Sequence, residues 1–156
     1  MESTASTSPM PGGVPPTNVG RLVRALTGFV TATRAKHGVV FGSDGLFLAR
    51  SGLDQVAAEQ ATAFAYGLRL ASDDFGTFVG RKTESLLVRY EDLDVLIMAM
   101  GAQTSVALSA PTSADLKSLM HSLTVFAERH APLAEAVHAS RARAPRIGHR
   151  RWEAVA

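Results

Sequence analysis

The chain contains no cysteine among its 156 residues. Disulfide bonds, thiolate metal sites and cysteine nucleophiles are therefore excluded, and we expect a reducing, cytoplasmic location. No apolar run approaches the roughly 18 residues that a membrane-spanning helix needs. Residues 1–17 are rich in Ser, Thr, Pro and Gly but lack the basic and apolar regions of a secretory signal, so we expect them to be disordered.

Acidic residues are scarce at the C-terminal end, and positive charge collects there. Residues 18–138 carry 11 Lys or Arg and 12 Asp or Glu, whereas residues 139–156 carry five Arg and one Glu. We expect residues 139–156 to be a solvated, disordered tail, which is favoured over a nucleic-acid site or a weak contact with a membrane surface. Trp152, beside Arg150 and Arg151, keeps those alternatives open.

Groups that could carry catalysis or hold a metal ion are also few. The histidines at positions 37, 121, 130, 138 and 149 have no spacing that places two ligands on one helix face, so we predict no metal site. Glu91, Asp92 and Asp94 cluster at a turn, where carboxylates are more often solvated than bound to a cation. We predict no catalytic residue, no cofactor and no enzymatic activity.

The stretch His37–Gly52, HGVVFGSDGLFLARSG, most resembles a functional motif. It has neither the spacing nor the lysine of a phosphate-binding P-loop, and Ser43 is misplaced for a nucleophile elbow. The β-branched and aromatic run before Asp44-Gly45, with a second apolar run after it, instead predicts a β-hairpin.

Apolar spacing predicts the remaining elements. Thr17 or Asn18 should cap a first helix that ends near Lys36, and Asp54 should cap a second that ends near Ser72. A loop over 73–82 is then followed by strands over 84–91, 93–100 and 103–109, and by a last helix that is capped by Thr112 or Ser113 and that Pro132 should kink or end. The expected fold is α/β in the broad sense, α+β in detail: a five-stranded antiparallel sheet flanked by helices, in the order αββαβββα.

The second helix has two apolar lines separated by a polar one. The polar line consists of Gln55, Glu59, Thr62, Tyr66 and Arg69. One apolar flank, Ala57, Ala61, Phe64, Ala65 and Leu68, should pack on the protein's own sheet. The other flank, which is Val56, Ala63, Gly67 and Leu70, needs a second cover, and we interpret it as a homodimer interface.

Five segments together resemble the Roadblock/LC7 family, especially its actinobacterial members. They are the hairpin VVFGSDGLFLARSGLD, the Ala-rich helix after it, and the strands ESLLVRYED, LDVLIMAMG and TSVALSAP, and the resemblance covers about residues 18–138. It implies a roadblock fold, related to longin and profilin domains, and a non-enzymatic homodimer with sheets joined edge to edge and second helices packed together. It further implies regulation or scaffolding of a small Ras-like GTPase, since similar actinobacterial proteins are typically encoded beside such a GTPase and a histidine-kinase-like sensor.

Two kinds of function follow. The favoured hypothesis is a cytoplasmic, homodimeric GTPase adaptor that can be held at the inner membrane face through its partners, with the polar line of the second helix as the partner-binding surface. The alternative is a small-ligand or nucleic-acid-binding module that uses the sheet or the arginine-rich tail. A deep pocket against the sheet would favour the alternative.

Overall fold

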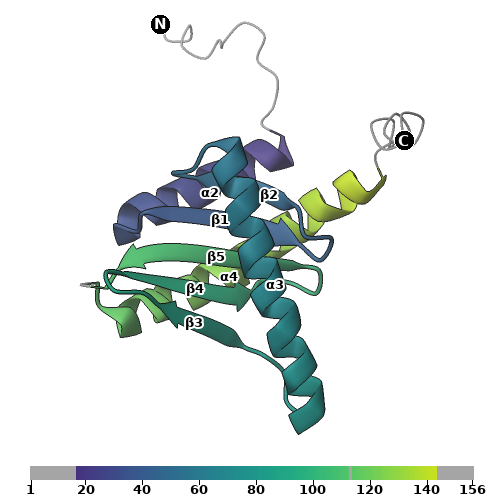
Figure 1. The fold of residues 1–156 in the computed structure, drawn as a ribbon. Helices are drawn as coiled ribbons and strands as arrows, with labels where there is room; N and C mark the ends of the chain where they lie inside the picture. The colour runs from purple at the N-terminus through teal and green to yellow at the C-terminus, as the bar shows by residue number, and fades with distance from the viewer. Residues whose placement is uncertain (1–16, 113, 144–156) are drawn as a thin grey trace, which may run out of the picture.

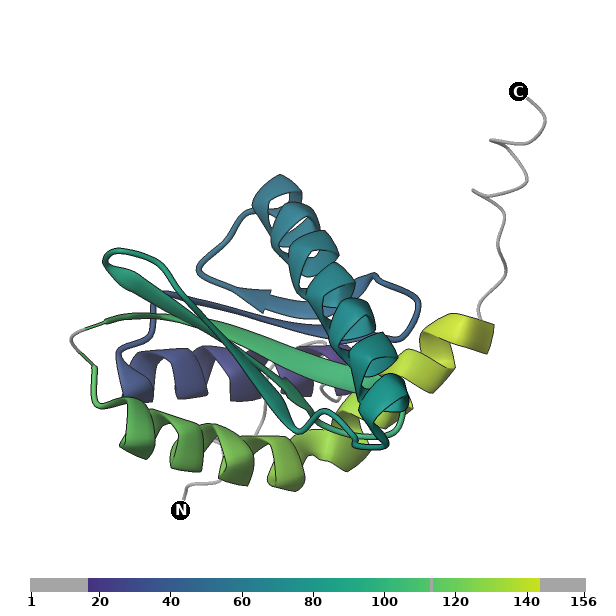
Figure 2. The ribbon, with the colours of Figure 1, turned by 60° about the horizontal axis from the view of Figure 1, so that its bottom comes forward.

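The computed structural model describes residues 17–112 and 114–143. They form three helices and five strands in the predicted order: α2 (Asn18–Thr33), β1 (His37–Gly42), β2 (Phe47–Ser51), α3 (Gln55–Val79), β3 (Ser85–Arg89), β4 (Leu93–Ala99), β5 (Thr104–Pro111) and α4 (Leu116–Arg143). Figure 1 shows α3 crossing one face of the sheet, and Figure 2 shows α2 and α4 side by side on the other face. The expected five-stranded antiparallel α+β fold is confirmed.

The strand order in the sheet is β2-β1-β5-β4-β3, and every neighbouring pair is antiparallel. The first hairpin and the later three-strand meander meet where β1 pairs with β5, from His37 opposite Ser109 to Gly42 opposite Thr104. The predicted hairpin is confirmed, with a register shift between Val40 and Phe41. Strands β2 and β3 are the two edges of the sheet.

The sheet separates two apolar cores. Successive side chains of a strand point to opposite faces, so Val40 packs under α2 and α4 while Val39 and Phe41 pack under α3. Burial on both faces explains why this strand reads as a continuous apolar run. The larger core, beneath α2 and α4, includes Leu22, Leu26, Leu108, Leu123 and Phe126.

The second helix is longer than its sequence suggests, and this corrects the predicted loop over residues 73–82. The Asp54 carboxylate accepts a hydrogen bond from the backbone N–H of Ala57 at 2.8 Å, as predicted, but α3 then continues to Val79. Gly80 ends it in the left-handed conformation, with φ +70°. Gly76 lies in the last turn because a Cβ there would come within 2.5 Å of the Arg81 carbonyl oxygen.

The last helix also departs from expectation at both ends. Its first turn is capped by Asp115, whose carboxylate accepts from the backbone N–H of Ser118 at 3.3 Å and from its hydroxyl at 3.0 Å. The predicted cap is Thr112 or Ser113; Thr112 instead donates its N–H to the Asp92 carbonyl, and residue 113 lies outside the described residues.

Pro132 does not end α4, which runs on to Arg143. Proline removes only one backbone N–H from the helix, and Pro132 is exposed, so water can reach the carbonyl it leaves free. The predicted domain boundary at His138 therefore falls inside α4, and residues 139–143 are helical rather than part of a disordered tail. Residues 144–156 of the expected tail and residues 1–16 of the expected N-terminal segment lie outside the described residues.

Candidate interaction surface

The side of α3 that points away from the sheet is apolar and uncovered. It holds the four residues predicted as a dimer interface, all of them accessible to solvent: Val56, Ala63, Gly67 and Leu70. Val56 is 63% exposed and Leu70 46%. A Cβ built on Gly67 would meet no atom within 4 Å, so the chain leaves room there for another helix to approach closely.

Three phenylalanines enlarge this surface, and sequence reasoning misses them. Periodicity places Phe64 on the buried flank, and Phe75 and Phe78 in a loop, yet all three are exposed, Phe78 by 84%. The rings of Phe75 and Phe78 lie 6.2 Å apart. Phe75 follows Phe64 by three helical turns, and Phe78 follows Gly67 by the same distance. This spacing is the sequence signal that could have placed both rings on the exposed side of the helix. We call Val56, Ala63, Phe64, Gly67, Leu70, Phe75 and Phe78 the α3 apolar face.

An open sheet edge lies next to the C-terminal end of α3. Strand β3 pairs only with β4 within the described residues, so one side of its backbone is free there. Leu86 and Val88 alternate toward the α3 side, opposite Ile97 and Val95 of β4, and both are only partly buried. The short connection from α3 into β3 brings this edge beside the helix (Figure 1). The apolar helix face and the open strand edge therefore lie near each other at the C-terminal end of α3.

The predicted outward polar line does not face outward as a whole, and this is a correction. Thr62 is 1% exposed, and Arg69 donates a 2.7 Å hydrogen bond to the Ser105 hydroxyl on β5. Tyr66 lies against Gly45 of the hairpin turn. Only Gln55 and Glu59 are exposed.

The line turned to the sheet consists of small residues, Ala58, Thr62 and Ala65, which let the helix lie close to the strands. Periodicity shows which residues share a line along a helix. It does not show which line is buried when two of the three are apolar.

A cavity of about 470 Å³ lies between the hairpin turn, α3 and the end of α4. Glu59, Thr62, Ala63 and Arg141 line it together with residues 45–47. The terminal nitrogens of Arg141 are already used: they donate to both carboxylate oxygens of Asp44 at 2.8 and 2.9 Å and to the Phe47 carbonyl at 2.7 Å. The terminal nitrogens of the one cation that lines this cavity are thus bonded within the chain, whereas its buried Nε and the buried Thr62 hydroxyl have no hydrogen-bond partner there.

Within residues 17–112 and 114–143, His, Asp and Glu side chains form no group of three that could hold a metal ion. In the same part of the chain, no helix is long and apolar enough to cross a membrane.

Comparison with known proteins finds relatives by structure but not by sequence. No protein-family model matches the chain. A search of curated proteins finds no match. Solved structures do match. A Roadblock/LC7 domain from Streptomyces avermitilis has a TM-score of 0.68 at 22% identity, covering 70% of this chain and 94% of that domain.

Two further matches are called MglB. Myxococcus xanthus MglB has a TM-score of 0.70 at 9% identity, covering 76% of this chain and 91% of its own. A gliding protein MglB from Thermus thermophilus has a TM-score of 0.67 at 16% identity, covering 80% and 93%. The resemblance in sequence is thus supported at the level of architecture: the chain has the Roadblock/LC7 fold in an MglB-like form.

Proposed function

We propose that the protein is a non-enzymatic homodimer that regulates or scaffolds a small Ras-like GTPase. The observation that carries the proposal is the α3 apolar face beside the open edge of β3, on a roadblock fold. Monomeric proteins rarely expose large contiguous apolar patches, and an unpaired edge strand invites pairing with another chain. A second copy that brings the same two features satisfies both at once.

In the proposed dimer, each α3 packs on its twin and the two β3 edges lie side by side. Ala63 and Gly67, four residues apart, allow the two helix backbones to approach closely. The phenylalanines would then cover the partly buried side of β3 and β4 in the other copy. Val56, Ala63, Gly67 and Leu70 remain the proposed centre of this interface.

The GTPase partner is proposed from the Roadblock/LC7 resemblance together with the MglB-like fold. For the contact surface we retain Gln55 and Glu59, which are exposed, and the accessible edges of Tyr66 and Arg69. Thr62 is not included because its side chain is buried. A histidine-kinase-like sensor is a further proposed member of the same complex.

The dimer is tested by light scattering coupled to size exclusion. We expect the unmodified chain to have twice the 16.5 kDa mass at micromolar concentration, and Gly67→Glu to be monomeric. Gly28→Glu on α2 is a matched control, since Gly28 is also helical and exposed with no atom within 4 Å of a Cβ. A monomeric unmodified chain, or equal behaviour of the two variants, would contradict the interface.

The GTPase proposal is tested by affinity purification of the tagged chain from its own cells with GDP or a non-hydrolysable GTP analogue. We expect a small Ras-like GTPase to be enriched and to bind directly once purified. Glu59→Lys should weaken that binding by about tenfold, whereas Glu128→Lys, the same change on α4, should not. Failure to recover any GTP-binding protein in either nucleotide state would contradict this function while leaving the dimer untouched.

A further inference from the structure

A second surface lies on the opposite side of the sheet, between α2 and α4. A groove of about 350 Å³ runs there, lined from α2 by Ala25 and Phe29 and from α4 by residues that include His121, Val125 and Arg129. The sheet separates α2 and α4 from α3 (Figure 2), so this groove and the α3 apolar face lie on opposite sides of it. Nothing in the proposed dimer covers it, so it is a surface that the proposed function does not use.

The floor of the groove is aromatic. The rings of Phe29 and Phe126 lie 4.7 Å apart, and the Phe126 and His130 rings are also 4.7 Å apart. Phe126 is buried, while Phe29 and His130 are partly exposed and Val125 is 38% exposed. An apolar side chain that enters from outside can therefore contact three rings and one aliphatic side chain.

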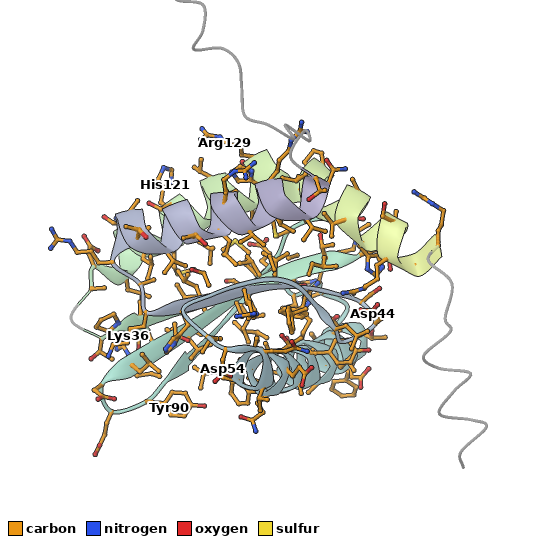
Figure 3. The ribbon with its side chains drawn as sticks, turned by 90° about the horizontal axis from the view of Figure 1, so that it is seen from above. Lys36, Asp44, Asp54, Tyr90, His121 and Arg129 are labelled. Atoms are coloured by element: carbon orange, nitrogen blue, oxygen red, sulfur yellow. The ribbon has the colours of Figure 1, made fainter. Side chains whose placement is uncertain are left out.

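The ionisable side chains that line the groove, which are His121, Arg129 and His130, are all basic. Arg129 and His121 stand on its α4 side and project away from the sheet (Figure 3). On α2, exposed Arg21 precedes Ala25 by one turn, and the whole helix from 18 to 33 contains no acidic residue. Glu128, the nearest acid on α4, points about 100° away from Arg129 around the helix and does not line the groove.

Helix α3, on the other side of the sheet, has the opposite sign. Over residues 54–79 the only basic residue is Arg69, set against Asp54, Glu59, Asp73 and Asp74. The α2–α4 groove is thus basic, whereas the helix α3 is acidic. A partner segment that carries carboxylates is attracted to the groove and repelled from the α3 side.

We propose that the α2–α4 groove binds an acidic, partly apolar segment of a partner protein. Its carboxylates pair with the Arg129 guanidinium and accept a hydrogen bond from an imidazole N–H of His121, and an apolar side chain enters against Phe29 and Phe126. A membrane surface fits less well, because the rings form the floor of a concave groove and a flat bilayer cannot reach them. Among the described lining residues, Val125 alone is a large hydrophobic side chain that is well exposed.

The test uses the full chain labelled with ¹⁵N and fluorescent synthetic 15-residue peptides that form amphipathic helices. The peptides carry Glu and Asp on one face and Leu or Phe one turn apart on the other; a second set replaces each acid by Gln or Asn. We expect binding of the acidic set to shift the amide signals of Phe29, Val125 and Arg129. Arg129→Glu should weaken this binding by about tenfold or more, and the uncharged set should bind about as weakly.

The matched control is Arg24→Glu, which makes the same charge change on an exposed residue of α2 that does not line the groove. It should weaken binding by less than about twofold. An equal loss for Arg24→Glu and Arg129→Glu would show unspecific attraction and overturn the proposal, as would an absence of shifts at the groove. Binding to vesicles rich in phosphatidylglycerol, with none of the peptides bound, would assign the surface to a membrane and overturn it too.

The outcome is independent of the GTPase proposal. Arg129 lies across the sheet from the α3 apolar face, so Arg129→Glu should leave both the dimer mass and the affinity for a purified GTPase unchanged. A variant that loses only peptide binding therefore reports on the groove, and a variant that loses only GTPase binding reports on α3.

Discussion

At the scale of single residues, the contact between Arg141 and the hairpin turn joins the C-terminal end of the described chain to its first hairpin. Figure 3 shows Asp44 beside the end of α4, and Arg141 reaches both its carboxylate and two backbone carbonyls of the turn. The Asp44 carboxylate also accepts from the backbone N–H of Leu46 at 3.1 Å, which fixes the turn itself. One arginine therefore holds the last turns of α4 against the first hairpin.

Replacing Arg141 by Met should lower the free energy of unfolding by about 1–2 kcal/mol, because two carbonyl hydrogen bonds and a partly exposed ion pair are lost. Urea unfolding measures the change. Arg143→Met, two residues further along α4, is the control and should have almost no effect. A double-mutant cycle with Asp44→Asn should assign less than about 1 kcal/mol to the ion pair, and that part should shrink in high salt. Equal stability of the two methionine variants would contradict the role of Arg141.

His130 makes stability depend on pH. Burial, and then the positive charge of Arg129, hold the pKa of His130 below its usual 6.5, and the described part of α2 brings no acid to offset them. The unfolded chain therefore binds a proton more readily than the folded one, and stability falls as pH drops below about 6.5. His37, whose pKa is lowered for the same kinds of reason, adds to the effect.

His130→Gln should therefore flatten the loss of melting temperature between pH 7 and about pH 5.5. Thermal unfolding in a pH series measures this. The carboxylates affect stability at a lower pH than the histidines do. The pKa of Asp94 is lowered by its hydrogen bonds to Arg89, so its stabilising effect is lost only below about pH 4. An unchanged slope above pH 5.5 in the variant would contradict the assignment to His130.

At the scale of elements, the end of α3 depends on one close approach of backbone to backbone. Arg81 donates its N–H to the Gly76 carbonyl at 2.8 Å, and its own carbonyl fills the place where a Cβ on Gly76 would lie. The turn that carries Phe75 and Phe78 can thus pack directly against the Arg81 carbonyl because residue 76 has no side chain.

Gly76→Ala should destabilise the protein by about 1–3 kcal/mol, although alanine favours helices in isolation. Gly28→Ala, at an open helical position, should instead stabilise it by about 0.5–1 kcal/mol. Chemical denaturation of both variants gives the comparison. A stabilising effect at both positions would mean that α3 can end without the contact to Arg81.

The same element shows how far sequence reasoning reaches. Alternation in the strands, the Asp54 cap and the hairpin were predictable because they depend on neighbours in sequence. The length of α3 was not, since Gly76 reads as a loop signal until the chain that folds back over it is known. The buried line of α3 was missed for a similar reason. Small residues such as Thr62 are needed there because the helix lies close to the sheet, and the distance between helix and sheet cannot be read from local periodicity.

At the scale of the whole molecule, the boundary of the folded chain lies beyond the predicted one. A disordered tail from residue 139 predicts that truncation after His138 leaves stability nearly unchanged. The structure reverses this expectation, because truncation there removes Arg141 and its bonds to the hairpin. We now expect the melting temperature to fall by about 3–8 °C.

A second truncation, after Arg143, separates the two parts of the predicted tail. It keeps Arg141 in place, and we expect it to melt within about 1 °C of the full chain. Differential scanning calorimetry of the three chains makes the comparison. If both truncations melt early, residues 144–156 contribute to stability and the assignment to Arg141 is incomplete.

The pairing of β1 with β5 has a consequence for how the chain reaches its fold. The hairpin and the meander each form from neighbours in sequence, but the centre of the sheet joins His37 to Ser109, across the whole length of α3. Bringing such distant segments together costs loop-closure entropy before any contact between them is made. The rate-limiting step of folding should be the closure of this central seam, with both halves of the sheet already formed on either side of it.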